Sequence, residues 1–391
     1  IPVRMTVNTP EGTRDRLFAE CQERREVQNR LIRLFRRRGY LEVSTPDTEF
    51  YDLFALSGSA IPQERMLQVG DLSGKICVMR PDSTTPIARV AATKLRALPL
   101  PQRLYYDQKV YRANPANNGA NREIPQCGVE LIGADGMKAD LEIIATAVDA
   151  LRCCGASRFH VELGQAGFFR ALAARLDADE DTLERMRALI EGKNFAALNQ
   201  LLAPYENDSA CAALKQLSRL FGGEEVLAQA EKLAGRTDAV DYLRALYDAL
   251  SAAGYGQYVR FDLGMVHQID YYTGVVFRGY VEGAGEAVLS GGRYDNLVEV
   301  FGRKAQATGF AVDVDAVART LPETPVAQLR TLVHYEPGYL AQALEAVDGC
   351  TAGTCELSPC VELEQTMALA VEKGVQTVLV YDKDGERQVS L

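Results

Sequence analysis

The feature of the sequence that most constrains the fold is a pair of segments that combine tyrosine, glycine and charge. Residues 270–274 have the sequence DYYTG and lead into an apolar run, and residues 291–295 have the sequence GGRYD. Side chains alternate along a strand, so Asp270 and Tyr272 would face one side and Tyr271 the other. A pocket floor with one phenol and one carboxylate suits a small polar ligand that forms hydrogen bonds. A half-buried strand that ends in a turn would show the same local pattern, so the rest of the chain must decide.

The length and the net charge of the chain limit the classes of protein to which it can belong. A chain of 391 residues can bury a sizeable core and is long enough for two or three domains. A formal net charge of -10 argues against a general nucleic-acid binder, which normally carries a basic surface, so we expect no nucleic-acid partner. The N-terminus lacks the apolar run of a signal peptide, and no stretch reaches the ~20 apolar residues of a membrane span. We therefore predict a cytoplasmic protein without a membrane partner.

The cysteines do not show the pattern of a metal site. There are nine, and only Cys350, Cys355 and Cys360 recur at a regular spacing, with no histidine close by in sequence. A zinc site would need a fourth ligand and tighter pairs. We expect no metal ligand, and we interpret these three residues as loop cysteines in a reducing cytosol.

One helix end and one helix start are predicted in the first part of the chain. A long amphipathic helix should end near Arg38, with Gly39 as its C-terminal glycine, before a short strand. Residues 80–86 have the sequence RPDSTTP and open a second helix, which Ser83 or Thr84 could cap. Taken alone, either pattern would fit many helix–strand proteins.

A pair of antiparallel strands joined by a loop follows. Residues 103–112 form a predicted strand that ends in Arg112, and the return strand at 122–133 carries Gln126 and Glu130. The planar fork of an arginine suits a carboxylate or phosphate, which makes Arg112 a candidate ligand-binding residue.

The order of these segments resembles that of the class II histidyl-tRNA synthetases. In that comparison the first helix and strand correspond to motif 1, the strand pair to motif 2 and residues 309–317 to motif 3. Residues 270–274 and 291–295 correspond to the two histidine-binding signatures. The resemblance implies an α+β fold, a class II aminoacyl-tRNA synthetase-like antiparallel sheet of six or seven strands flanked by helices. The implied domains are residues 1–320, with a helical insertion at about 168–253, and a small C-terminal α/β domain at 326–391.

The resemblance also implies a histidine pocket. Glu130 and Tyr272 would contact the imidazole, because a neutral imidazole donates one proton and accepts one. Asp82 and Gln126 would bind the amino group and Arg112 the carboxylate, although Asp82 is one methylene shorter than the glutamate of the family. The alternative for Glu130 and Tyr272 is a pair of strand residues that satisfy each other. The predicted histidine-binding residues are Asp82, Thr84, Arg112, Gln126, Glu130, Tyr271 and Tyr272.

Two arginines that serve ATP and catalysis in the synthetases are absent from this chain. The synthetases have R-G-L-D-Y-Y where residues 267–272 are HQIDYY, so His267 replaces the catalytic arginine. The motif 3 arginine that stacks on adenine is replaced by Ala316. Losing one such charge costs roughly 3 kcal/mol or more of barrier. We therefore expect no catalytic residue and no cofactor.

A synthetase-like chain that lacks the anticodon-binding domain and ends in a short α/β unit closely resembles the regulatory subunits of ATP phosphoribosyltransferase. This resemblance implies a non-catalytic partner of the short-form catalytic subunit in a hetero-oligomer, which acts in the first step of histidine biosynthesis. It also implies feedback inhibition by L-histidine and a homodimer through residues 21–46. Two alternatives stay open: an active histidyl-tRNA synthetase, and a synthetase paralogue with another amino-acid-dependent chemistry.

Overall fold

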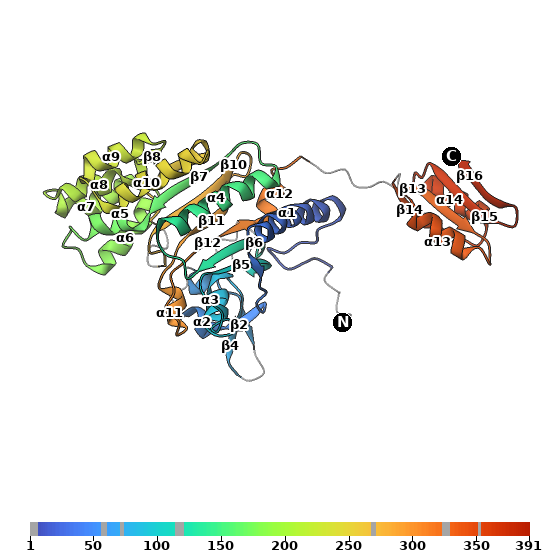
Figure 1. Cartoon of the computed structure of the whole chain (residues 1–391), viewed down its shortest axis with the longest axis horizontal. Coiled ribbons are helices and arrows are strands. Elements are labelled where there is room, and N and C mark those ends of the chain that lie inside the picture. The colour runs from blue at the N-terminus through green and yellow to red at the C-terminus, as the bar shows by residue number, and fades with distance from the viewer. Residues whose placement is uncertain are drawn as a thin grey trace, which may run out of the picture. The chain divides into compact units, whose positions relative to one another are not determined.

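The computed structural model describes residues 7–55, 61–70, 74–113, 121–266, 271–322, 329–350 and 353–391. It divides into two compact units, Ile1–Pro322 and Glu323–Leu391 (Figure 1). His267 and Asp270 lie outside the described residues, so the predictions made for them stay predictions.

The first unit is built on one large sheet. Its described strands have the order β1-β5-β6-β12-β11-β10-β7-β9-β8. The run from β5 to β7 is antiparallel, whereas β1 pairs with β5, and β9 with β7, in parallel. The predicted six or seven antiparallel strands are therefore the centre of a larger mixed sheet. The strands are β1 (Leu41–Glu42), β5 (Gln102–Tyr111), β6 (Glu123–Ile132), β7 (Phe159–Gln165), β8 (Phe221–Gly222), β9 (Val259–Asp262), β10 (Val275–Val281), β11 (Ala287–Arg293) and β12 (Ala307–Asp313).

The sheet is covered by helices on both faces because its side chains alternate. On β5, Tyr105 belongs to the core under the long helices α1 (Phe18–Arg37) and α4 (Gly136–Cys154). Its neighbours Leu104 and Tyr106 belong to a second core with α3 (Thr84–Ala92) and α11 (Leu297–Val300). Figure 1 shows α1 and α4 along one side of the strands and α3 on the other. This second core lies beside the candidate site.

The end of α1 agrees with its prediction from the sequence. Its apolar face buries Val27, Leu31, Leu34 and Phe35, the spacing of one helical stripe. The helix ends at Arg37, and Gly39 then adopts a left-handed φ of 81° that favours glycine.

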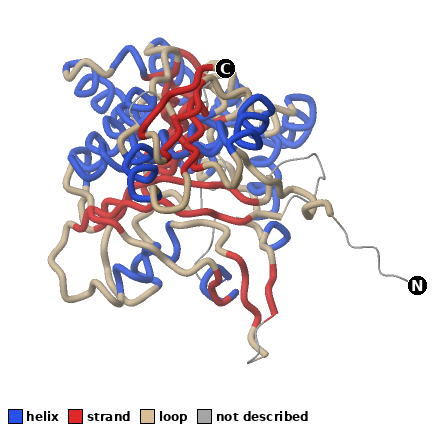
Figure 2. Tube along the Cα trace, turned by 90° about the vertical axis from the view of Figure 1, so that its right-hand side faces the viewer, coloured by secondary structure: helices blue, strands red, loops and turns tan. Residues whose placement is uncertain are grey.

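A three-stranded sheet projects from the lower part of this unit in Figures 1 and 2. Its strands are β2 (Thr48–Phe50), β4 (Ile76–Met79) and β3 (Gln68–Gly70), and it carries α2 (Tyr51–Ala55) and the 3-10 helix η1 (Gln63–Arg65). Arg80, 1% exposed, ties it to the large sheet. The guanidinium of Arg80 donates to the carbonyl of Thr45 at 2.7 Å, to that of Pro46 at 2.6 Å and to that of Lys109 at 2.6 Å.

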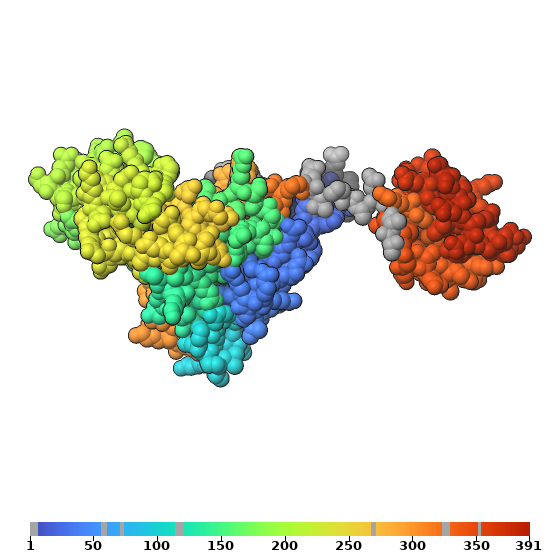
Figure 3. Space-filling model, turned by 45° about the horizontal axis from the view of Figure 1, so that its top comes forward, coloured from blue at the N-terminus to red at the C-terminus, as the bar shows by residue number. Residues whose placement is uncertain are grey.

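Helices form nearly all of the predicted insertion, which is a lobe of its own in Figure 3. It also contributes the two-residue strand β8, which the helical pattern of the sequence did not indicate. Within the described part of the chain, no helix is both long and apolar enough to cross a membrane. The helices are α5 (Ala166–Ala173), α6 (Glu180–Glu191), α7 (Phe195–Leu202), α8 (Ser209–Gln216), α9 (Glu225–Ala234) and α10 (Asp238–Ala252).

The second unit is a small α/β domain with the strand order β14-β13-β15-β16. Helix α13 (Leu340–Asp348) packs with one apolar cluster and α14 (Leu363–Glu372) with another. The strands are β13 (Leu329–Tyr335), β14 (Thr354–Leu357), β15 (Thr377–Asp382) and β16 (Gly385–Ser390).

One prediction about this unit is wrong. Cys355 was interpreted as a loop residue, but it lies in strand β14, between α13 and α14. Cys350 and Cys355 form a disulfide, and their Cα atoms lie 6.4 Å apart, whereas Cys360 is free. Sequence spacing could not show this pairing, because it is β14 that brings Cys355 back beside the end of α13.

Candidate ligand-binding site

A cavity of about 120 Å³ lies over the middle of the large sheet, beside the start of α3. The cavity is smaller than the ~300–1,000 Å³ of pockets for drug-sized ligands, so it suits a ligand of about amino-acid size. All seven residues predicted to bind histidine line it. The lining residues are Ile61, Asp82, Ser83, Thr84, Tyr106, Arg112, Gln126, Glu130, Tyr271, Tyr272, Ser290, Gly291, Tyr294, Gly309, Phe310 and Ala311.

Glu130 is the buried carboxyl group of this cavity, with 1% of its surface exposed. Its oxygens accept hydrogen bonds from the hydroxyl of Thr84 at 2.8 Å and from that of Tyr294. Gly309 leaves room for it, because a Cβ at that position would overlap the carboxylate of Glu130 and the backbone oxygen of Val129. Burial raises the pKa of Glu130 to about 8, although the bonds from Tyr294 and Thr84 oppose the shift.

This pKa predicts how the free protein responds to pH. The folded pKa of about 8 lies above the ~4.3 of an unfolded glutamate, so the folded state holds an extra proton between these values. The contribution of Glu130 to stability is fully present below about pH 4 and is lost as pH rises through 8. From pH 5.5 to 8, the wild type should lose more free energy of unfolding than Glu130→Gln, by at most about 1.4 kcal/mol per pH unit. Urea unfolding at several pH values measures this, and parallel pH profiles would contradict it.

The start of α3 differs from its prediction in one detail. Asp82 caps the helix, because its carboxylate accepts from the backbone N–H of Thr85 at 2.8 Å and from the Thr85 hydroxyl at 3.1 Å. Ser83 and Thr84, the predicted caps, do not. The Thr84 hydroxyl binds Glu130, and the buried Ser83 hydroxyl has no hydrogen-bond partner among the described residues. Desolvation raises the pKa of Asp82, while the bonds from Thr85 and the charge of Arg112 oppose the shift.

Both tyrosines of the DYYTG segment face the cavity, so their predicted placement on opposite faces of a strand is wrong. Strand β10 begins at Val275, and residues 271–274 form no strand before it. The backbone N–H of Thr273 donates to the carbonyl of Arg293 at 2.8 Å. This contact fastens the segment to the end of β11 and turns both rings inward. The rings of Tyr271 and Tyr272 meet edge to face, with centroids 5.0 Å apart.

Tyr294 is a pocket residue that sequence reasoning missed. Its hydroxyl donates to Glu130, and its ring stacks on Tyr271 with centroids 5.6 Å apart. The signal was present, because Tyr294 belongs to the GGRYD segment that had been singled out. The register that sends its side chain toward Glu130 depends on how β11 pairs with β12, which the sequence does not show.

The preceding residue, Arg293, is buried and has a structural role. It is 5% exposed, and its guanidinium donates to Asp140 of α4 at 2.8 and 3.0 Å and to Asp295 at 3.1 Å. The hydroxyl of Tyr242, from the insertion, also donates to Asp140. This network joins α4, the insertion and the end of β11 next to the pocket.

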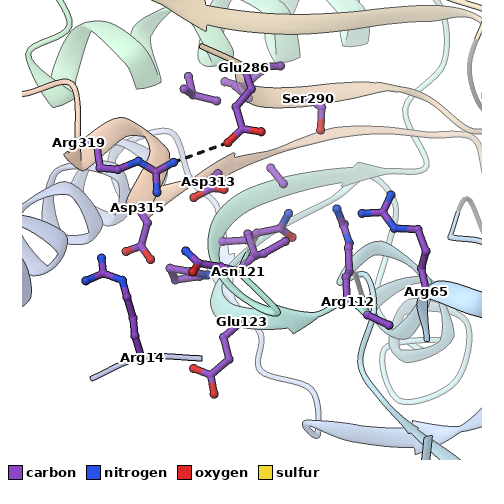
Figure 4. A pocket seen from close by; sticks show the side chains of 18 residues that line it. Arg14, Arg65, Arg112, Asn121, Glu123, Glu286, Ser290, Asp313, Asp315 and Arg319 are labelled. Carbon is purple, nitrogen blue, oxygen red and sulfur yellow. Dashed lines mark ion pairs between the residues drawn. The ribbon is translucent and has the colours of Figure 1, made fainter. Parts of the chain in front are cut away.

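Arg112 and Gln126 also line a second, larger cavity of about 720 Å³. The Nε of Arg112 donates to the carbonyl of Pro81 at 3.0 Å, and burial lowers the pKa of its guanidinium. Figure 4 shows Arg112 and Arg65 at one end of this cavity and Arg319 with Asp315 at the other. The lining includes Arg14, Arg65, Arg112, Arg319, Glu123, Glu286, Asp313 and Asp315.

The segment that corresponds to motif 3 offers this larger cavity carboxylates and no arginine. Ala316 is buried in α12 (Val314–Ala318), and the side chain of Asp313 caps that helix. Asp315 binds the guanidinium of Arg24, with N–O distances of 2.7 and 2.9 Å, and also that of Arg16. Asp313 thus serves as a helix cap, and Asp315 serves internal ion pairs. In the described part of the chain, no cluster of histidine, cysteine and acidic side chains is suited to hold a metal ion.

Relatives of this chain identify its family. The profile of the histidyl-tRNA synthetase family matches residues 12–317. The ATP phosphoribosyltransferase regulatory subunit of Clostridium kluyveri is 44% identical over 320 residues, which are 80% of this chain and 81% of that protein. The protein of the same name from Clostridium acetobutylicum is 38% identical over 385 residues, which are 95% of each chain.

Solved structures agree with these sequence relatives. A crystal structure of an ATP phosphoribosyltransferase regulatory subunit/histidyl-tRNA synthetase from Bacillus halodurans C has a TM-score of 0.84 and 30% identity. The match covers 96% of this chain and 98% of that one. Histidyl-tRNA synthetase from Nostoc sp. PCC 7120, at 16% identity, has a TM-score of 0.76 over 99% of this chain and 97% of that one, which shows the fold alone. The predicted class II synthetase-like fold is confirmed, and the chain belongs to the family of ATP phosphoribosyltransferase regulatory subunits.

Proposed function

We propose that this chain is the non-catalytic regulatory subunit that binds free L-histidine and transmits feedback inhibition to a short-form catalytic ATP phosphoribosyltransferase subunit. The observation that carries the proposal is the buried carboxyl of Glu130 in a cavity of about 120 Å³ that also receives Arg112. The cavity keeps groups for each polar part of histidine, while the neighbouring motif 3 segment has lost its arginine.

The contacts that we propose follow the polarity of the ligand. The imidazole would lie against Glu130 and Tyr272, because a carboxyl and a phenol complement its donor and acceptor nitrogens. The ammonium group would bind Asp82 and the amide oxygen of Gln126. The carboxylate would bind the guanidinium of Arg112, whose Nη atoms have no hydrogen-bond partner among the described residues. Thr84 supports the site by orienting Glu130.

Calorimetric titration of the purified chain with free amino acids tests the proposal. We expect L-histidine to bind one site per chain, and glutamine and phenylalanine to bind much more weakly, because neither presents an imidazole to Glu130. Absence of binding by L-histidine, or equal affinity for the three amino acids, would contradict the proposal.

The second prediction concerns catalysis. The motif 3 segment presents Asp313 and Asp315 to the larger cavity and buries Ala316, so it supplies no cation for a nucleotide. Adenylate formation requires positive charge at the reacting phosphate. We therefore predict no histidine-dependent exchange between pyrophosphate and ATP above a blank without protein. Measurable exchange would favour the alternative of an active histidyl-tRNA synthetase.

The third prediction concerns assembly. We propose that residues 21–46, which include most of α1 and all of β1, form the seam of a homodimer. Strand β1 lies at the edge of the large sheet, and Leu41 in it is 69% exposed, which leaves an edge and an apolar side chain for a second copy. Analytical ultracentrifugation at micromolar concentration should give a dimer, and Leu41→Glu should shift it toward monomer. A wild-type chain that sediments as a monomer would count against the seam.

Feedback needs only that histidine bind one state of the hetero-oligomer more tightly than the other. A ligand shifts an equilibrium between two states by its difference in affinity for them, and the coupling is reciprocal. Binding of the catalytic subunit in its inhibited state should therefore raise the affinity of this chain for histidine.

A further inference from the structure

We propose that Arg65 is a second arginine of the ligand site, and that Arg65 and Arg112 together bind the carboxylate of the amino acid. This inference rests on the proposed function, because it assigns one more residue to the same ligand. It extends the site into the end of the larger cavity.

The backbone holds Arg65 beside Arg112. Arg65 ends the 3-10 helix η1, and its carbonyl accepts the backbone N–H of Ala113 at 2.8 Å, which fixes it next to the end of β5. Both side chains line the larger cavity, and Figure 4 shows the two guanidinium groups side by side, directed into it. Position 65 thus reaches the pocket from a segment that was not a candidate in the sequence.

The two guanidinium groups lie close enough for their charges to interact, with Asp82 as a nearby carboxylate. Burial lowers the pKa of Arg112, Asp82 raises it, and the positive charge of Arg65 lowers it further, which indicates that the groups are close enough to repel. Among the described residues, no carboxylate forms an ion pair with Arg65 or Arg112 within 4.0 Å. Two neighbouring guanidinium groups with no such ion pair favour the binding of an anion between them.

A carboxylate is the anion that fits this position. Its two oxygens can accept hydrogen bonds from two planar guanidinium groups at once. Arg112 lines both cavities, so a ligand whose ring reaches Glu130 would place its carboxylate at the mouth that Arg65 borders.

The test compares two ligands that differ only at the carboxylate. Calorimetry measures the binding of L-histidine and of L-histidinol, which carries a hydroxymethyl group instead, to the wild type, Arg65→Met and Arg65→Lys. We expect Arg65→Met to weaken binding of histidine about tenfold, the lower end for loss of a charge-assisted hydrogen bond, because Arg65 is exposed. Its affinity for histidinol should stay within about twofold of wild type. Arg65→Lys keeps the charge but not the planar fork of donors. Its affinity for histidine should lie between those of the wild type and Arg65→Met.

The outcomes separate this inference from the proposed function. If the wild type binds histidine and Arg65→Met binds it equally well, Arg65 is a solvated surface residue and the inference is wrong. If Arg65→Met weakens both ligands by the same factor, its effect is not on the carboxylate and the inference is also wrong. If the wild type binds no histidine, the proposed function itself fails. Matching circular dichroism and thermal melting of the variants show that each has folded.

Discussion

Replacing Glu130 with glutamine should weaken the binding of free histidine about tenfold to a hundredfold. The substitution keeps the size of the side chain but removes its ability to carry charge. With a pKa of about 8, Glu130 is mostly protonated in the empty pocket at pH 7, and a bound imidazole can take up that proton to form a charged pair. The imidazolium then donates to Glu130 from one ring nitrogen and to the hydroxyl oxygen of Tyr272 from the other. Glutamine can offer only a neutral hydrogen bond. Losing a charge-assisted bond costs roughly 1.5–3 kcal/mol, which gives the expected range.

A matched substitution elsewhere separates the pocket from general effects of losing a carboxylate. Glu282 is exposed and pairs with the equally exposed Arg158. Glu282→Gln should leave the affinity for histidine unchanged within the error of calorimetry. Equal affinity of wild type and Glu130→Gln would place the histidine sensor outside this cavity.

The second large effect is expected on stability. Replacing Arg293 with methionine should cost about 3–5 kcal/mol in the free energy of unfolding, because it leaves the charge of Asp140 buried without its cation. Asp140 is 1% exposed, and the Arg293 guanidinium donates to it at 2.8 and 3.0 Å. Urea unfolding followed by circular dichroism at fixed protein concentration measures the loss.

Two control variants test whether the loss of stability comes from the buried ion pair between Arg293 and Asp140. Arg158→Met removes an arginine from an exposed ion pair and should cost less than about 1 kcal/mol. Adding Asp140→Asn to Arg293→Met should recover part of the loss, because it removes the uncompensated charge. A loss below about 1 kcal/mol for Arg293→Met, or no recovery in the double variant, would show that this ion pair does not hold α4 to the sheet.

The sequence predicted the parts of the fold that depend on long periodic patterns. The stripe of α1 and the glycine after it, and the strand pair β5–β6, follow from residue spacing. The edge strand β8 does not, because two residues carry no period. Strand β8 exists only because the insertion folds back to pair with β9.

In the candidate site too, the sequence predicted some features and not others. The ordered motifs indicated the seven residues, and the structure brings them together around one cavity. The directions of individual side chains were less predictable. Tyr271 and Tyr272 share a face because Thr273 is fastened to β11, and Tyr294 reaches Glu130 through the register of β11 against β12. These are long-range contacts, so spacing along the chain does not determine them.

The role of Asp82 shows how one residue can combine two tasks. Its carboxylate caps α3 through Thr85, which fixes its position beside Arg112 and Glu130. The capping bonds occupy one lone pair on each oxygen and leave others for a ligand ammonium group. The shorter side chain of aspartate, compared with the glutamate of the synthetases, is therefore compatible with the proposed contact.

The measurement that tests the central claim most directly is the inhibition by histidine of the reconstituted hetero-oligomer with its catalytic subunit. Each complex is compared with its own rate in the absence of histidine, for the wild type, Glu130→Gln and the control Glu282→Gln. If the pocket around Glu130 is the sensor, the histidine concentration for half inhibition rises about tenfold to a hundredfold in Glu130→Gln and stays at the wild-type value in Glu282→Gln. Inhibition curves that coincide for all three complexes would contradict the account.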